Sequence, residues 1–333
     1  MEKKYFYNNL IILVALIICI CFYNYKLDPY GIWKTDFSEQ VLEPNKIYLK
    51  TKYILENPNK YDSFIFGSSR VGAIEGELLE NGNYYNMTYS QGLPKDWLEN
   101  IKLFLSKGVK IKNIFIALDD FSFTVDPSSH DSEPLRLSYS KLNHHPFEYF
   151  KAYLLRDPWN LYNRETIKGQ KINHRDGAKM DLYGTGRGFN TFTDEVKFLE
   201  TITNEEINSS KYNIPTIYFD KDRTKDTLNE ISEIINICHK NNISLKVIFN
   251  PLHHTTYSAT DRDILNNAIE EVSKLTDLWD FTGLNSITSN NYYWLETSHY
   301  RLIVGRMILE KVYNINLGVD TPKDFGTYIE KLN

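Results

Sequence analysis

Cysteine is scarce in this chain, which has only three among its 333 residues. Cys19 and Cys21 lie in a long apolar run near the N-terminus, and Cys238 lies alone in a later apolar-periodic segment. The sequence therefore offers neither a disulfide framework nor the cysteine spacing of a zinc site. The pairs His144–His145 and His253–His254 also lack the i, i+4 spacing that places two metal ligands on one helix face. We expect no metal and no cofactor.

An excess of positive charge is also missing. The chain has 38 lysines and arginines against 43 aspartates and glutamates, which gives a formal net charge of −5 at pH 7. Nucleic-acid-binding domains instead carry a basic patch or stripe, so we expect no nucleic acid partner. The sequence has no internal repeat or low-complexity tract, and its length is enough for a sizeable hydrophobic core.

Charged residues are absent from Tyr5 to Tyr25, a run that Lys3 and Lys4 precede and Lys26 closes. About 20 apolar residues are enough for a helix to cross the hydrocarbon core of a membrane. A cleaved signal peptide is the alternative, but no small-x-small cleavage pattern follows the run. We expect a retained single-pass anchor. Lysines flank both of its ends, so the charge rule leaves the orientation open; the short N-terminal stub and long C-terminal domain favour an extracytoplasmic domain.

After this run, short apolar segments alternate with segments of helical periodicity. Such alternation predicts a mainly parallel sheet with helices on both faces, an α/β fold arranged as a three-layer α/β/α sandwich. The expected strands are 63–66, 84–88, 113–118, 245–250 and 278–281, and the expected helices are 94–105, 227–240, 261–275 and 299–312. The expected divisions are a cytoplasmic stub (1–7), the span (8–25), a stalk and lead-in (26–58), the domain (59–320) with an irregular insertion (about 121–222), and a C-terminal tail (321–333).

The strongest local signal is the segment Ser63–Arg70, in which an apolar run stops at Gly67-Ser68-Ser69. A glycine permits a sharp exit from a buried strand. In open α/β sheets, ligands bind at the carboxyl ends of the strands, so a serine at this turn is placed to act as a nucleophile. The alternative is a turn with no further role, because glycine and serine are common turn residues.

The second signal, Glu296-Thr297-Ser298-His299, lies far downstream. Imidazole titrates near neutrality and can take the proton of a serine. A carboxylate can hold the second ring nitrogen and fix the tautomer. The alternative is a helix start capped by Thr297 or Ser298. Together the two segments predict a serine hydrolase or acyltransferase, with His299 as the base and Glu296 as the carboxylate that orients it.

With these motifs the chain resembles the SGNH (GDSL-type) hydrolases over roughly residues 28–312. It is most similar to their membrane-anchored branch, which works with membrane-bound O-acyltransferases and includes the teichoic-acid D-alanylation protein and alginate-type acetylation proteins. The resemblance implies an SGNH/flavodoxin-like sandwich in a bacterial cell membrane. It also implies Ser69 rather than Ser68 as the nucleophile, and the backbone amides of Ser69 and Gly92 as the oxyanion hole.

The sequence departs from the SGNH pattern at two places. Glu296 stands where the family usually has an aspartate, so its carboxylate is one methylene further from the backbone. The usual Gly-x-Asn-Asp block is absent, and Leu118-Asp119-Asp120 follows the third expected strand. Asp119 would then line the site, but an ionised aspartate cannot donate a hydrogen bond to an oxyanion.

Three further groups are candidates for the site. Arg70, beside the nucleophile, would either bind an anionic polymer or lie in solvent as a first-turn cation. His253, after the fourth expected strand, would either line the cleft or act as a loop or helix cap. Aromatic residues of the insertion would stack on sugars or pack in a core; they are Tyr149, Phe150, Tyr153, Trp159 and Tyr162.

The expected function is acyl transfer to, or acyl removal from, a cell-surface polymer. By the resemblance, the acyl group is acetyl or D-alanyl, and the polymer is a polysaccharide or a teichoic-acid-like chain. The alternative is a non-catalytic accessory protein of a membrane-bound O-acyltransferase. The substituted Asp and Asn positions favour this alternative.

Overall fold

The structure is a computed structural model of the chain and describes residues 2–33, 43–156, 182, 184–187 and 191–332. The described strands form one six-stranded sheet with the order β2-β1-β3-β4-β5-β6. They are β1 (Ser63–Phe66), β2 (Tyr84–Asn86), β3 (Asn113–Leu118), β4 (Ser244–Phe249), β5 (Leu278–Asp280) and β6 (Thr327–Ile329). Neighbouring strands are parallel except β5 and β6, which are antiparallel. The prediction of an α/β fold with a mainly parallel sheet is confirmed.

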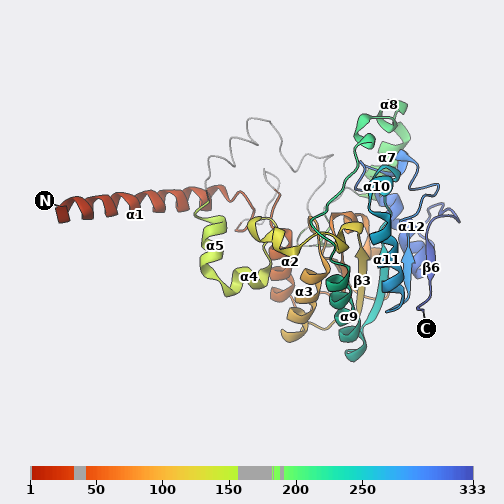
Figure 1. Cartoon of the computed structure of the whole chain (residues 1–333), viewed down its shortest axis with the longest axis horizontal. Helices are drawn as coiled ribbons and strands as arrows, with labels where there is room; N and C mark the ends of the chain where they lie inside the picture. The colour runs from red at the N-terminus through yellow and green to blue at the C-terminus, as the bar shows by residue number, and fades with distance from the viewer. Residues whose placement is uncertain (1, 34–42, 157–181, 183, 188–190, 333) are drawn as a thin grey trace.

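Helices precede the sheet, connect its strands and form part of the insertion (Figure 1). The described α-helices are α1 (Glu2–Leu27), α2 (Lys46–Glu56), α3 (Pro94–Ser106), α4 (Tyr139–His144), α5 (Pro146–Tyr153), α7 (Phe192–Thr201), α8 (Asn204–Ile207), α9 (Thr224–Lys240), α10 (His254–Ala259), α11 (Arg262–Ser273) and α12 (Leu302–Tyr313).

Successive residues of the central strands contribute to two different apolar cores, because side chains alternate between the faces of a sheet. In β1, Phe64 and Phe66 belong to a core shared with α3, α9 and α11. Ile65 belongs to the other core, which is shared with α12. All four residues of β1 and all six of β3 are buried. Because β1, β3 and β4 are parallel neighbours, the loops that leave their carboxyl ends lie along one edge of the sheet.

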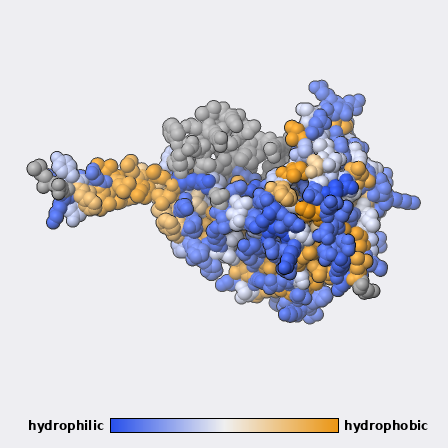
Figure 2. Space-filling model, viewed as in Figure 1, coloured by the Kyte–Doolittle hydropathy of each residue, from blue (hydrophilic) through white to orange (hydrophobic). Residues whose placement is uncertain are grey.

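Helix α1 projects away from the rest of the protein (Figure 1), and the face seen in Figure 2 is apolar along the middle of the helix and hydrophilic at its N-terminal end. The stretch Lys3–Leu27 has a mean hydropathy of 2.3, and only 6% of its 18-residue apolar window is buried. Among the described residues, it is the one helix that is long and apolar enough to cross a membrane. A core helix of a water-soluble domain would bury one face against its neighbours, and α1 does not.

The last turns of α1 and the residues directly after them are packed against the insertion. The side-chain amide of Asn24, in the last turns of α1, donates to the backbone carbonyls of Leu154 and Arg156 at 2.8 and 2.7 Å. Tyr30 and Ile32 are buried in a small apolar cluster with residues of α4 and α5. This part of the chain, which we expected to be a stalk, is therefore fixed to the domain by buried contacts.

Two other segments differ from their sequence-based expectations. The insertion contains α4, α5, α7 and α8, although we expected an irregular segment. The expected C-terminal tail contains β6, whose residues Thr327–Ile329 pair with Leu278–Asp280 of β5. A strand of three residues is too short to produce a readable alternation of apolar and polar positions, so its sequence does not predict it.

Candidate active site

The turn after β1 presents Ser69 at the carboxyl edge of the sheet. A Cβ atom on Gly67 would lie only 2.5 Å from a methyl group of Val71, so this sharp turn requires a glycine. Ser68 is buried, and its hydroxyl accepts a hydrogen bond from the backbone amide two residues later, which caps the 3₁₀ helix Ser69–Ala73. Ser69 is thus the first residue of this helix, and it is partly exposed.

Ser69, His299 and Glu296 form a hydrogen-bonded chain. The Oγ atom of Ser69 lies 2.7 Å from Nε2 of His299. Nδ1 of His299 contacts Oε1 of Glu296. Since an ionised carboxylate only accepts hydrogen bonds, the ring proton lies on Nδ1, and Nε2 is free to accept the proton of Ser69. The structure therefore brings together the three residues for which the sequence predicts a triad.

Glu296 is held by its own loop despite its extra methylene. Oε2 accepts from the amide of Ser298 at 2.7 Å, and Oε1 accepts from the amide of His299 at 3.0 Å. Burial raises the pKa of Glu296, but the His299 ring and the Ser298 amide lower it more, and the net pKa lies below the usual glutamate value. The carboxylate therefore stays ionised at neutral pH, as the orienting role requires.

Gly92 lies against the nucleophile turn. A Cβ atom on Gly92 would be 2.4 Å from the carbonyl oxygen of Gly67, so only a glycine allows this close approach. Within the described part of the chain, neither the amide of Ser69 nor that of Gly92 donates to another group. Two neighbouring unpaired amides are the usual construction of an oxyanion hole. Their role in catalysis remains a prediction.

Arg70 has neither of the two roles that we expected for it, because its side chain is 1% exposed. One guanidinium nitrogen, Nη1, donates to Oδ1 of Asp119 at 2.7 Å and to Oδ1 of Asp120 at 2.8 Å. Nε donates to the carbonyl of Ser298 at 3.0 Å. The side chain thus ties the end of β3 to the loop that carries His299.

Asp119 belongs to this buried network. Burial raises its pKa, while the guanidinium of Arg70 acts in the opposite direction. Its Oδ1 also accepts from the side-chain amide of Asn250 at 3.0 Å, and Oδ1 of Asn250 accepts from the Tyr300 hydroxyl at 3.0 Å. The sequence motifs assign no role to Asn250, although it follows β4 directly. The rule that polar residues gather at the carboxyl ends of parallel strands would have found it.

Glu43, which belongs to none of the sequence motifs, interacts electrostatically with His299 and with two cations. Glu43 and Lys46 form an ion pair of 2.8 Å, and Arg136 donates to the hydroxyl of Ser90 at 3.3 Å. Burial raises the pKa of Glu43, but Lys46, Arg136 and His299 together bring it below the usual value. These side chains come from the lead-in and the insertion. No local sequence pattern links positions so far apart, so the sequence does not predict this group.

His253 caps a helix and does not line the site. It is fully buried, its Nδ1 accepts from the amide of Thr255 at the start of α10, and its Nε2 lies 2.8 Å from Oδ1 of Asn291. Of the two expected roles, the structure therefore shows the cap. Burial lowers the pKa of His253 to about 4, so the ring is neutral at physiological pH. Among the described residues, no group of three or more His, Cys, Asp or Glu side chains could hold a metal ion.

His253→Asn should flatten the dependence of stability on pH. The folded-state pKa is about 4 and the usual value is 6.5, so below pH 6.5 the unfolded chain binds a proton that the folded chain does not. The free energy of unfolding should then fall by about 1.4 kcal/mol per pH unit from this group as the pH drops from about 6.5 to about 4. Urea unfolding in detergent at several pH values measures the slope.

The control for this prediction is His144→Asn, which changes an exposed histidine. The control should keep the slope of the unmodified protein, and His253→Asn should reduce it. Equal slopes in all three proteins would contradict the buried, neutral state of His253.

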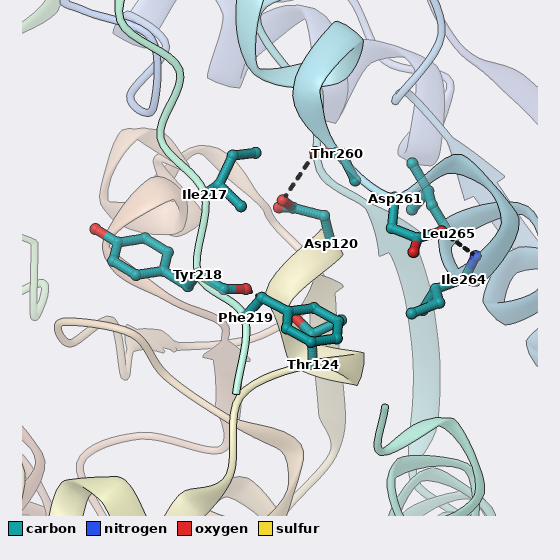
Figure 3. Close-up of a pocket in the computed structure, with 9 residues that line it drawn as sticks. All are labelled: Asp120, Thr124, Ile217, Tyr218, Phe219, Thr260, Asp261, Ile264 and Leu265. Atoms are coloured by element: carbon teal, nitrogen blue, oxygen red, sulfur yellow. Dashed lines mark hydrogen bonds between the residues drawn. The ribbon is translucent and has the colours of Figure 1, made fainter. Parts of the chain in front are cut away.

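A shallow hollow, partly open to solvent, lies beside Asp120 (Figure 3). Oδ2 of Asp120 accepts from the Thr260 hydroxyl at 3.3 Å, while its Oδ1 binds Arg70. The hollow is lined mainly by apolar side chains and by neither Ser69 nor His299, so it is separate from the triad. Its lining residues are Asp120, Thr124, Ile217, Tyr218, Phe219, Thr260, Asp261, Ile264 and Leu265.

Two of the expected aromatic residues of the insertion, Tyr149 and Tyr153, pack against the lead-in or against each other. Tyr149 and Tyr153 contact each other with ring centroids 5.3 Å apart, and Tyr153 also contacts Tyr30. Of the two expected roles, core packing holds for Tyr153, which is 1% exposed. Trp159 and Tyr162 lie outside the described residues.

No model of a known protein family matches the chain, and no curated protein matches its sequence. The functional assignment therefore depends on the geometry around Ser69 and on the resemblance of the motifs.

Proposed function

We propose that this protein is an SGNH-type acyltransferase or esterase that uses Ser69, His299 and Glu296. The proposal includes a three-layer sandwich fold, a location in a bacterial cell membrane and a domain outside the cytoplasm. The substrate is a cell-surface polysaccharide or a teichoic-acid-like polymer. The observation that carries the proposal is the 2.7 Å contact between Ser69 Oγ and His299 Nε2, with Glu296 on the other ring nitrogen.

The reaction follows from the chemistry of these groups. Ser69 Oγ attacks the carbonyl carbon of an acyl donor while its proton moves to Nε2 of His299. The negative charge that develops on the carbonyl oxygen is stabilised by the amides of Ser69 and Gly92. His299 then gives the proton to the departing oxygen, which leaves the acyl group on Ser69. A polymer hydroxyl or a water molecule then attacks the acyl group on Ser69 while His299 takes its proton, and His299 returns the proton to Ser69 as the acyl group leaves. The choice of transfer over hydrolysis comes from the family resemblance.

Incubation of the purified full-length protein with an activated ester tests the proposal. Mass spectrometry of peptides should find the acyl group on Ser69. Ser258→Ala removes an exposed hydroxyl in α10 and should label normally, while Ser69→Ala should not label. Labelling of Ser69→Ala to the same extent would show that another residue reacts, and would remove the basis for the triad.

The second candidate function is a non-catalytic accessory protein of a membrane-bound O-acyltransferase. The observation that favours it is the buried pairing of Asp119 with Arg70. Asp119 stands where an SGNH enzyme offers an oxyanion donor, and an ion-paired carboxylate only accepts hydrogen bonds. In this role the protein would bind the acyltransferase or the polymer, and Ser69 would be dispensable.

The proposed location predicts the accessibility of the two ends of the chain. A protease added to intact cells should cleave the domain that follows α1. A peptide tag placed before Lys3 should be protected until the cells are opened, because a single span separates the two. The reverse pattern would place the domain in the cytoplasm and exclude surface polymers as substrates.

A further inference from the structure

We infer that the exposed face of helix α5 (Pro146–Tyr153) lies against the lipid headgroups of the membrane that α1 crosses. This inference depends on the membrane anchor of the proposed function but not on the chemistry of Ser69. Its basis is the attachment of α5 to the end of α1 and the side chains that α5 exposes.

The depth of α5 is set by Asn24. The uncharged run of α1 extends to Tyr25, and about 20 such residues cover the hydrocarbon core. Asn24 therefore lies at the boundary between hydrocarbon and headgroups. Its side-chain amide donates to the carbonyls of Leu154 and Arg156, which directly follow α5. One end of α5 is thus held at the level of the headgroups.

The direction of α5 keeps the rest of the helix at that level. In Figure 1, α5 runs across the end of α1 rather than along it, at the side of the domain nearest to α1. Its inner face is fixed by aromatic contacts: Trp33 contacts Tyr149 with ring centroids 6.2 Å apart and Tyr25 of α1 at 5.2 Å. The helix therefore cannot turn its outer face toward the domain without losing this packing.

The outer face of α5 exposes an aromatic ring and a lysine, two side chains that are favoured at a membrane interface. Phe147 is 68% exposed, the largest exposure of a phenylalanine in the described chain. Lys151, one helical turn later, is also exposed. An aromatic ring beside a lysine is favoured at the headgroup level, because the ring leaves water while the ammonium reaches anionic lipid. Phe22 and Tyr23 of α1, exposed by 61% and 45%, add two aromatic rings near the same headgroup level.

A lipid surface explains the exposed ring better than a protein partner does. α1 itself places the membrane at this side of the domain, so the bilayer is present whenever the anchor is inserted. A protein at the same position would have to displace lipid from around α1. We therefore assign the surface to lipid, and a protein contact becomes an outcome of the test.

Photo-crosslinking of the full-length protein in vesicles of phosphatidylcholine and phosphatidylglycerol tests this inference. Benzoylphenylalanine replaces Phe147 in one variant. It replaces Leu13 of α1 in a positive control and Tyr328 of β6 in an aromatic control that is 47% exposed and lies far from α1 in Figure 1. After irradiation, position 147 should yield lipid adducts at a level near that of position 13. The level should exceed that of position 328 about tenfold or more, as expected for a ring that leaves water.

Each outcome decides the inference. Equal, low yields at positions 147 and 328 with high yield at 13 would overturn it and leave the anchor intact. Low yield at position 13 would overturn the anchor and the inference together. In native membranes, a protein adduct at 147 in place of lipid would also overturn it. Crosslinking needs no catalysis, so Ser69→Ala should give the same pattern, whether or not the proposed chemistry is correct.

Discussion

Ser69→Ala should abolish acylation of the cell-surface polymer that we propose as the substrate. Removal of the nucleophile of a triad lowers the rate by about 10⁴-fold or more, and leaves only the contribution of binding and of the oxyanion hole. The fold should not change, because Ser69 is partly exposed and the cap of the 3₁₀ helix is formed by Ser68. The acyl content of purified polymer measures the effect, with the membrane level of the protein determined in the same cells.

The same experiment separates the two candidate functions. An accessory protein should tolerate the loss of one hydroxyl, because a single hydroxyl contributes little to a docking surface. Ser258→Ala is the matched control and should have full acylation under either function. Normal acyl content with Ser69→Ala would end the covalent mechanism and leave the accessory role as the better explanation.

Arg70→Met should cause a large loss of stability. The substitution leaves Asp119 and Asp120 buried without their cation, and breaking a buried ion pair from one side costs about 3–5 kcal/mol. It also removes the hydrogen bond to the Ser298 carbonyl, so the His299 loop loses its connection to β3. Urea unfolding of the full-length protein in detergent, followed by tryptophan fluorescence, measures the loss.

Two further variants control this prediction. Lys102→Met breaks an exposed pair with Glu233, whose side chains are 49% and 50% exposed, and should cost at most about 1 kcal/mol. Arg70→Met combined with Asp119→Asn and Asp120→Asn removes the uncompensated charges and should recover part of the lost stability. If Arg70→Met were as stable as the unmodified protein, the network would not support the His299 loop.

The central strands could be predicted from the sequence because they are continuous apolar runs that end at polar residues. The expected bounds of β1 and β3 agree with the structure at both ends. Because both faces of these strands are buried, nearly every position is apolar and the sequence shows a continuous apolar run. The grouping of Ser69, His299 and Glu296 could be predicted for a related reason: Ser69 follows a recognisable strand, and Glu296 and His299 are close in the sequence. The choice of Ser69 over Ser68 comes from the family resemblance, and the catalytic roles stay predictions.

The hydrogen bonds of Arg70 and Asn24 could not be predicted, because their partners are distant in the sequence. The carboxylates that neutralise Arg70 come 49 and 50 residues later. The carbonyls that bind Asn24 come 130 and 132 residues later. A lone arginine after a strand is usually solvated, and an asparagine at the end of an apolar helix gives no sign of a distant acceptor. Only the tertiary structure reveals either contact.

The hydrogen bonds of Asn24 limit how far the domain that carries Ser69 can move relative to helix α1. A flexible tether would let Ser69 sample a hemisphere above its anchor, and the effective concentration of any substrate would follow from tether length. In the membrane-inserted protein that we propose, the hydrogen bonds of Asn24 to Leu154 and Arg156 would instead hold the domain, and Ser69 with it, near one height above the membrane. If the proposed function is correct, a donor held in the same membrane would reach Ser69 by lateral diffusion, and a polymer chain would be acylated only along the portion that lies at that height.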